Sequence, residues 1–277
     1  MTDRPVRRRK PQTVLEVIRR DQLTPHMVRL YLGGPNFSSF EASEFADSYV
    51  KIFFVKPELD LEPPYDVAAL REHLAPEDLP VTRTYTVREV NAAEQWLAID
   101  FVVHGAEGLA GPWAERVQPG ERVVLSGPGG AFNPDPTADW HLFLGDESSL
   151  PAIAASLEAL PAEAVGTALI EVGGPQDELP LRAPAGLEVR WLHRGTAPAG
   201  TTTILADAAA ALPWREGRVC AFAHGEREAV KALRDVLFSH RELERSQVSI
   251  SGYWAYGRTE DRFQAEKREP VGKIFTD

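Results

Sequence analysis

The chain has 277 residues, of which 43% are hydrophobic and 9% aromatic, and this balance suits a soluble globular protein of two ordinary domains. Its formal charge of −11 argues against nucleic-acid binding, which needs a basic face. Cys220 is the single cysteine, so an internal disulfide and a cysteine-ligated iron–sulfur cluster are excluded.

No apolar run reaches the ~20 residues that cross a bilayer, and no signal sequence is recognisable. The sequence therefore predicts a cytoplasmic protein without membrane insertion. Residues 1–12 are basic and lack apolar periodicity, which predicts a flexible arm.

From Thr13 onward, short alternating apolar runs are separated by Pro, Gly, Asn and Asp, and this pattern predicts antiparallel strands. The first three runs cover residues 13–24, 26–34 and 48–55. Residues 57–80 are acidic and proline-rich, so we expect a surface loop with at most a short helix.

The segment RTYTVR, from Arg83 to Arg88, places an aromatic ring and hydroxyl groups between two arginines. In a strand of period two, Arg83 and Tyr85 point to one side of the sheet and Thr86 to the other. Guanidinium groups bind phosphate oxygens bidentately, and a flat aromatic beside them suits a flavin nucleotide. An edge strand whose polar face is merely solvated is the alternative interpretation.

A glycine-rich segment follows the next apolar run. Gly105, Gly108 and Gly111 expose backbone N–H groups, and Pro112 suits the first turn of a helix that carries Trp113. A loop that leads into a helix N-terminus is an anion site, so this segment is a candidate diphosphate site for the same nucleotide. An ordinary glycine-rich turn beside a packed tryptophan is the alternative.

Residues 97–103 and 122–127 predict two further strands, and no long helix separates the strands of this half. We therefore expect an antiparallel Greek-key barrel over residues 13–135. After the segment NPDP at 133–136, short apolar runs alternate with helical patterns. Residues 136–258 thus predict a doubly wound parallel sheet, with a ligand site at the carboxyl ends of its strands. Residues 259–277 are highly charged and predict a helix or a loose extension.

The ordered motifs resemble the siderophore-interacting branch of the ferredoxin reductase-like proteins, also called siderophore ferric reductases. RTYTVR matches the R-x-Y-[ST]-x-R flavin signature, and HGAEGLAGPW is similar to the HG-x-x-G-x-A-x-x-W loop of that branch. The resemblance continues through GPGG, LFLGDESSLPAI, VRWLHRG, AHGE and ISGYWAYG, and so covers nearly the whole chain. It implies a barrel that binds FAD, followed by a domain that resembles NAD(P)-binding domains.

The resemblance also implies which residues bind FAD. Arg83 would pair with the flavin phosphate, Tyr85 would pack on the isoalloxazine, and Thr86 would hydrogen-bond near its reactive edge. The flavin carries the chemistry, so no side chain is required as an acid or a nucleophile. The implied flavin-binding residues are Arg83, Tyr85, Thr86, Asp100, Val102, His104, Gly105, Ala110, Gly111, Trp113 and Trp254.

NADPH or NADH is the implied electron donor, with ferredoxin as the alternative. Asp146 and Glu147 would lie beside the donor's diphosphate and repel it, unless Asp146 accepts backbone N–H bonds or Glu147 caps the following helix. Arg194, Arg227 and Lys231 are candidates to pair with a 2′-phosphate. The implied NAD(P)-binding residues are Gly145, Asp146, Glu147, Ser148, Ser149, His224, Gly225 and Glu226.

The implied electron acceptor is a ferric siderophore, with Lys51 and Arg258 as candidate ligands. Lys51 is a lone charge between apolar neighbours, and a lysine on the wet face of a strand is the alternative interpretation. Many relatives have GPRG where this chain has GPGG, so Gly129 offers no cation to a highly anionic catecholate.

We therefore predict a monomeric, FAD-dependent ferric-siderophore reductase that releases iron as Fe(II). The alternatives are a siderophore-binding or delivery protein without reductase turnover, and a general NAD(P)H:flavin electron-transfer module. A hydrolase is disfavoured, because the run GDESS lacks the spacing of G-x-S-x-G.

Overall fold

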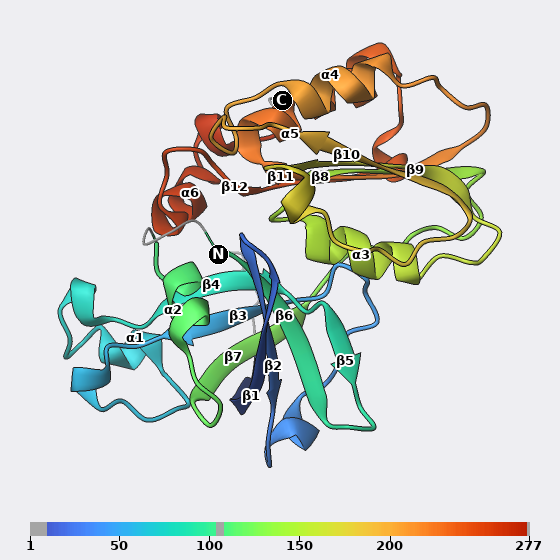
Figure 1. Cartoon of the computed structure of the whole chain (residues 1–277). Coiled ribbons are helices and arrows are strands. Elements are labelled where there is room, and N and C mark those ends of the chain that lie inside the picture. Colours follow the sequence, from blue (N-terminus) through green and yellow to red (C-terminus); the bar gives the residue numbers. More distant parts are fainter. Residues whose placement is uncertain (1–9, 104–107, 276–277) are drawn as a thin grey trace, which may run out of the picture.

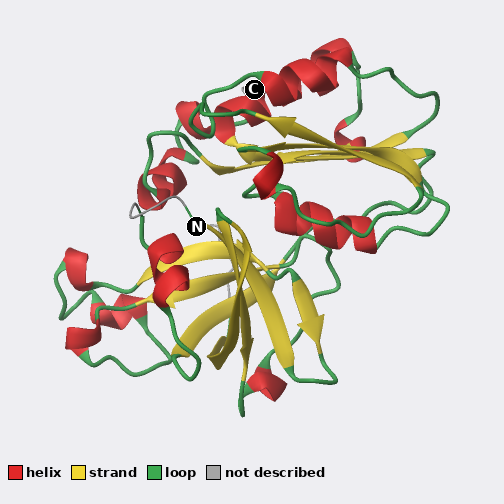
Figure 2. Ribbon diagram, in the orientation of Figure 1, coloured by secondary structure: helices red, strands yellow, loops and turns green. Residues whose placement is uncertain are grey.

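The computed structural model describes residues 10–103 and 108–275, and it divides them between two sheets (Figure 1, Figure 2). The first sheet has seven antiparallel strands in the order β4-β3-β7-β1-β2-β6-β5. Their bounds are β1 Gln12–Thr24, β2 Met27–Gly33, β3 Tyr49–Phe54, β4 Val81–Thr86, β5 Glu89–Asn91, β6 Trp96–Val102 and β7 Arg122–Gly129.

The first sheet curls until its β4 edge returns to β6. Just beyond β4, the backbone N–H of Arg88 donates to the carbonyl of Ala98 at 2.8 Å, and the ring centroids of Tyr85 and Phe101 lie 4.3 Å apart. Alternate residues of the strands, such as Leu15 and Val17 of β1, point into the interior and are buried there. The predicted antiparallel barrel is confirmed in this arrangement.

The second sheet has five parallel strands in the order β10-β9-β8-β11-β12. Helices cover both of its faces (Figure 2), so the predicted doubly wound sheet is confirmed. The strands are β8 Trp140–Asp146, β9 Val165–Val172, β10 Gly186–His193, β11 Val219–Glu226 and β12 Val248–Trp254. The α-helices of the described residues are α1 Val67–Leu70 and α2 Ala110–Arg116 beside the barrel, then α3 Leu150–Glu158, α4 Ile204–Ala211, α5 Arg227–Arg234 and α6 Glu260–Glu266.

The central strand β8 is buried along its whole length, as expected for a parallel strand covered on both faces. Leu150, Ile153 and Leu157 of α3 pack against one face of the sheet, where Met27 of the barrel joins the same apolar cluster. The helices α4 and α5 cover the opposite face. The α3 layer therefore forms the apolar contact between barrel and sheet.

Two polar contacts also join the barrel to the second sheet. Arg88 forms a bidentate ion pair with Glu158 at the end of α3, at 2.9 and 2.6 Å. His26, in the β1–β2 turn, lies 2.8 Å from the buried Asp177. The sequence pattern offered Arg88 as a second phosphate-binding group, but Arg88 lies past the end of β4 and holds the two domains together.

The C-terminal extension, as far as Phe275, packs against the second domain. Thr259 caps α6, whose Phe263 is buried. After α6 the chain runs along α5, where Lys231 and Arg234 donate to the carbonyls of Val271 and Ile274 at 2.8 and 2.6 Å. Of the two expectations for this segment, a helix or a loose extension, the helix is confirmed. None of the helices in the described ranges is long and apolar enough to cross a membrane.

Candidate functional site

A cavity of about 520 Å³ lies where the barrel meets the carboxyl edge of the parallel sheet. Doubly wound sheets ordinarily bind ligands at this place, because the strand order reverses between β8 and β11. The described residues that line it are Tyr49, Lys51, Arg83, Thr84, Tyr85, Thr86, Asp100, Val102, Asp146, Glu147, Ser148, Pro151, Ala199, Ser251, Tyr253, Trp254, Glu260, Gln264 and Lys267.

The strand β4 supplies the wall expected to face a flavin. Arg83, Tyr85 and Thr86 all line the cavity, as the sequence predicted for residues of one site. Burial raises the pKa of Tyr85 well above its usual range, and the nearby charge of Glu260 acts in the same direction. The phenol therefore stays neutral at physiological pH and offers an aromatic face and a hydroxyl to a ligand.

Arg83 is held by a carboxylate that the sequence did not connect with it. Its Nη1 and Nη2 atoms lie 3.1 and 2.9 Å from the two carboxylate oxygens of Asp261 on α6. The Arg83 side chain is 16% exposed and that of Asp261 is 65% exposed. A phosphate at this place would compete with Asp261 for the same guanidinium face.

Asp100 and Val102 on β6 line the same cavity. The carboxylate of Asp100 is engaged in a bidentate ion pair with Arg29 of β2, at 2.6 and 2.8 Å. Hydrogen bonding to Asp100 raises the pKa of Arg29 despite its burial. Asp100 thus reaches the cavity as part of a neutralised pair, which limits its use as a flavin ligand.

The glycine-rich segment contributes the helix α2 beside the barrel. The indole of Trp113 packs edge-on against Phe54 and Phe101, with ring centroids 5.3 and 5.6 Å apart. A Cβ on Gly111 would lie 3.1 Å from the carbonyl of Val102, so the close approach of α2 to β6 favours glycine there. Ala110, Gly111 and Trp113 are absent from the cavity lining as far as the described residues define it. His104 and Gly105 lie outside the described residues.

Asp146, at the end of β8, connects three strands of the sheet. One carboxylate oxygen accepts from the backbone N–H and the hydroxyl of Ser148, at 2.9 and 2.5 Å. The other accepts from the backbone N–H of Glu226 and from the indole N–H of Trp254, both at 2.8 Å. Of the two expectations for Asp146, the one in which it accepts backbone N–H bonds matches the structure.

One expectation was that Glu147 caps α3, but the structure shows other partners for its carboxylate. Its Oε1 lies 2.6 Å from Nη1 of Arg194 and accepts from the backbone N–H of Gly173 at 3.1 Å. Burial raises the pKa of Glu147 to about 7, against the opposing effect of Arg194. Ser149 occupies the cap position of α3 without a side-chain cap bond, because its hydroxyl exchanges hydrogen bonds with the backbone of Asp146.

The residues at the end of β11 make hydrogen bonds and packing contacts within the fold and fall outside the described lining of the cavity. His224 is buried, its ring stacks 3.8 Å from that of Phe222, its Nε2 lies 2.9 Å from the hydroxyl of Ser249, and burial lowers its pKa to about 3. Gly225 has φ +151°, and a Cβ there would lie 2.7 Å from a carboxylate oxygen of Asp146. Glu226 caps α5 through bonds from the backbone N–H groups of Glu228 and Ala229.

The predicted nucleotide-binding set therefore separates into two groups. Asp146, Glu147 and Ser148 line the cavity, whereas the other five fall outside its described lining. Those five are Gly145, Ser149, His224, Gly225 and Glu226. The three cations considered for a 2′-phosphate are already paired. Arg194 contacts Glu147, Arg227 contacts Glu266 at 2.6 Å, and Lys231 contacts Glu228 at 3.0 Å.

Lys51, a candidate siderophore ligand, lies in the cavity wall, and the C-terminal extension adds a second lysine. Lys267 follows α6, and the charge of Lys51 together with partial burial lowers its pKa. Arg258, the other predicted siderophore ligand, is absent from the described lining, and its guanidinium lies 2.9 Å from Glu266. The sequence missed Glu260, Gln264 and Lys267 because they belong to a charged tail. Its only indication was Phe263, an apolar residue isolated among charges.

The glycine at position 129 has a packing reason. A Cβ on Gly129 would lie 2.4 Å from the ring of Tyr49, which lines the cavity. Tyr49 thus lies against the backbone where relatives with GPRG have an arginine. The cavity wall at this position is aromatic instead of basic.

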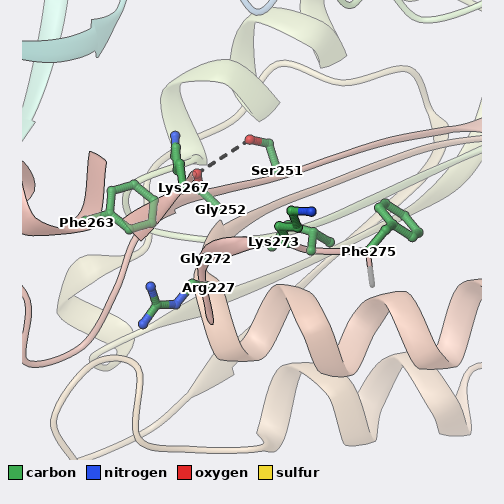
Figure 3. Close-up of a pocket in the computed structure, with 9 residues that line it drawn as sticks. Arg227, Ser251, Gly252, Phe263, Lys267, Gly272, Lys273 and Phe275 are labelled. Atoms are coloured by element: carbon green, nitrogen blue, oxygen red, sulfur yellow. Dashed lines mark hydrogen bonds between the residues drawn. The ribbon is translucent and has the colours of Figure 1, made fainter. Parts of the chain in front are cut away.

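A smaller cavity of about 330 Å³ lies between β12 and the last described residues of the chain (Figure 3). Ser251 and Lys267 line both cavities, so the two are neighbours. Lys273 and Phe275, near the end of the described chain, are among the residues that line it. No group of three or more His, Cys, Asp or Glu side chains suited to a metal ion occurs within residues 10–103 and 108–275.

Comparison with known proteins agrees with this architecture. Residues 16–132 match the siderophore-interacting FAD-binding domain, and residues 138–257 match the siderophore-interacting protein family. An uncharacterized protein of Mycobacterium tuberculosis is 45% identical over 94% of this chain and 96% of its own. The ferric vibriobactin reductase ViuB of Vibrio cholerae is 34% identical over 95% and 96%. An NADPH-dependent ferric-chelate reductase of Escherichia coli is 31% identical over 64% and 70%.

Solved structures show the same fold. A siderophore utilization protein from T. fusca superposes with a TM-score of 0.77 at 37% identity, over 90% of this chain and 94% of that one. A ferredoxin reductase of carbazole 1,9a-dioxygenase superposes with a TM-score of 0.63 at 18% identity, over 86% and 68%, which is a likeness of fold alone.

Proposed function

This chain belongs to the siderophore-interacting protein family, and from that premise we propose that it is an FAD-dependent ferric-siderophore reductase that releases iron as Fe(II). The observation that carries the proposal is the cavity of about 520 Å³ between the barrel and the parallel sheet. It brings the flavin-signature residues of β4 to the same space as two lysines and the carboxyl edge of the sheet.

The residues of the barrel fit a flavin. When bound, FAD would supply the transfer of electrons from a two-electron donor to a one-electron acceptor. Arg83 would bind its phosphate once Asp261 is displaced or shared, and the ring of Tyr85 would pack on the isoalloxazine. Thr86, at the end of β4, would hydrogen-bond near the reactive edge.

Lys51 and Lys267 support an acceptor that carries negative charge. A ferric chelate with oxygen ligands would be drawn to this basic side, which holds the iron close to the flavin-binding strand. Reduction to Fe(II) lowers the charge on the metal and weakens its bonds to hard oxygen ligands, so the iron can leave. The chain's contribution is to bind, orient and attract, and no side chain acts as an acid or a nucleophile.

One experiment separates this function from its alternatives. The purified flavin-loaded protein is reduced anaerobically, and several ferric siderophores are then added while flavin absorbance is followed. We expect reoxidation by siderophores and the appearance of Fe(II) in a ferrous-chelator assay. Siderophore binding without reoxidation would identify a binding or delivery protein, and equal rates with unrelated acceptors would identify a general electron-transfer module.

A further inference from the structure

The carboxyl edge of the parallel sheet is where a dinucleotide-binding domain normally receives the diphosphate of its ligand. Backbone N–H groups at strand ends and helix N-termini bind the phosphate oxygens there. In this chain the corresponding positions lie at the ends of β8, β9 and β11. A diphosphate can bind here only through backbone N–H groups that do not already donate to other atoms of the chain.

The N–H groups at the end of β11 are bound by the chain's own carboxylates. Oε2 of Glu226 accepts from the N–H groups of Glu228 and Ala229 at 2.5 and 2.9 Å, which are the first donors of α5. Its Oε1 accepts from the N–H of Tyr256 at 3.0 Å. The N–H of Glu226 itself donates to Asp146 at 2.8 Å.

The ends of β8 and β9 repeat this arrangement. Asp146 accepts from the N–H of Ser148 at 2.9 Å, and Glu147 accepts from the N–H of Gly173 at 3.1 Å. Glu171 lies beside them and accepts from the hydroxyl of Thr202 at 3.0 Å. A carboxylate oxygen therefore occupies each position at which a phosphate oxygen would bind these donors.

The charge of this edge opposes a diphosphate as well. Asp146, Glu147, Glu171 and Glu226 are all buried, between 3% and 7% exposed. Arg194 is the cation paired with this group, and it contacts Glu147. Burial raises the pKa of Glu147 and of Glu171, which shows that negative charge is already disfavoured here. Two further negative charges brought among these four buried acidic groups would be repelled, since repulsion is strong where water is excluded.

We infer that the carboxyl edge of this sheet does not bind a dinucleotide diphosphate, so that the ADP half of a nicotinamide donor contributes nothing to its recognition. The inference rests on the proposed function and concerns the class of donor. A reduced nicotinamide would then be recognised through its ring alone. It would supply the hydride of its C4–H bond to bound FAD, and the oxidised ring would leave as the pyridinium cation.

The test compares donors with and without the ADP half on the flavin-loaded protein. Flavin reduction is followed by stopped flow with NADPH, NADH and reduced nicotinamide riboside, which carries neither phosphate of the diphosphate. A bound diphosphate makes several charge-assisted hydrogen bonds, each worth about 1.5–3 kcal/mol, so its loss normally slows reduction by far more than ~10-fold. We expect the three second-order rate constants to agree within about 10-fold. A larger advantage of NADH or NADPH over the riboside overturns the inference.

An equilibrium measurement gives a second readout. ADP and 2′,5′-ADP are titrated into the flavin-loaded protein by calorimetry, and we expect no heat of binding at millimolar concentration. Saturable binding of either overturns the inference. If no nicotinamide reduces the flavin and only a protein donor does, the titration with ADP and 2′,5′-ADP alone tests the inference. A chain that binds no FAD, or whose reduced flavin reduces no ferric siderophore, contradicts the proposed function, which is a different result from either outcome above.

Discussion

Replacing Arg83 and Asp261 separately should change FAD affinity in opposite directions. The Arg83 guanidinium is 16% exposed and faces the cavity, so a bidentate contact with a flavin phosphate is partly shielded from water. A hydrogen bond to a charged group contributes about 1.5–3 kcal/mol, so Arg83→Ala should raise the Kd for FAD roughly 10- to 150-fold.

Asp261→Asn should tighten binding instead, because the amide no longer competes with phosphate for Arg83. The Asp261 side chain is 65% exposed, and such surface ion pairs contribute at most about 1 kcal/mol. The expected gain is therefore no more than about fivefold. The assay is a titration of the flavin-free protein with FAD, in which the quenching of flavin fluorescence reports binding.

Arg122→Ala provides a matched control on the same barrel, because Arg122 forms an exposed ion pair with Glu62 at 3.3 Å. Its Kd for FAD should equal that of the wild type. If Arg83→Ala binds FAD as tightly as this control does, Arg83 does not hold the phosphate. If Asp261→Asn weakens binding, Asp261 positions Arg83 and does not compete with the ligand.

Three further changes have separate readouts. Lys51→Ala should leave the Kd for FAD unchanged and raise the KM for a ferric siderophore about fivefold, which is the effect of removing one partly solvated charge. An unchanged KM would show that Lys51 is only a solvated residue on the face of its strand. Arg88→Ala should lower the free energy of unfolding, measured in urea, by about 1–2 kcal/mol, because it breaks a bidentate ion pair whose Glu158 side chain is only 30% exposed. A variant as stable as the wild type would show that the contact between Arg88 and Glu158 does not contribute to stability. The pKa of Glu147 is raised from 4.5 to about 7, so the folded state binds the proton of this carboxyl more tightly than the unfolded state does. The free energy of unfolding should therefore fall as the pH rises from about 4.5 to about 7, and it should level off above pH 7. Glu147→Gln should remove its contribution to that slope, and pH titrations of stability for both proteins that coincide would refute the shift.

The sequence was sufficient for the two sheets because their signals are local. Alternation along residues 13–24 and the continuous apolar run of β8 each follow from how much of a strand is covered. The alternation of RTYTVR likewise indicated a strand, and the structure forms β4 over its first four residues, all of which line the cavity. Arg88 was interpreted differently because the end of a strand is poorly marked in sequence, and its partner Glu158 lies 70 residues away.

The partners of charged residues could not be predicted from the sequence. Asp261 lies 178 residues from Arg83, and nothing in either local pattern connects them. For the run GDESSLP, local geometry left repulsion and hydrogen bonding as competing interpretations of Asp146. Only the register of β8, β11 and β12 brings the N–H of Glu226 and the indole of Trp254 to its carboxylate.

The charges around the cavity are divided between its two sides in a way that assigns binding mainly to the barrel. On the sheet side, backbone N–H groups and Arg194 already satisfy the carboxylates of Asp146 and Glu147. On the barrel side, Lys51 has no ion-pair partner among the described residues, and Lys267 beside it rests on the ring of Phe263 at 4.6 Å. An anionic ligand therefore finds cations that can be used only on the side of the flavin strand and the C-terminal extension. Because both the proposed cofactor and the proposed acceptor carry negative charge, both would be recognised on this side, the cofactor by Arg83 and the acceptor by Lys51 and Lys267, and the α/β domain supplies the opposite wall.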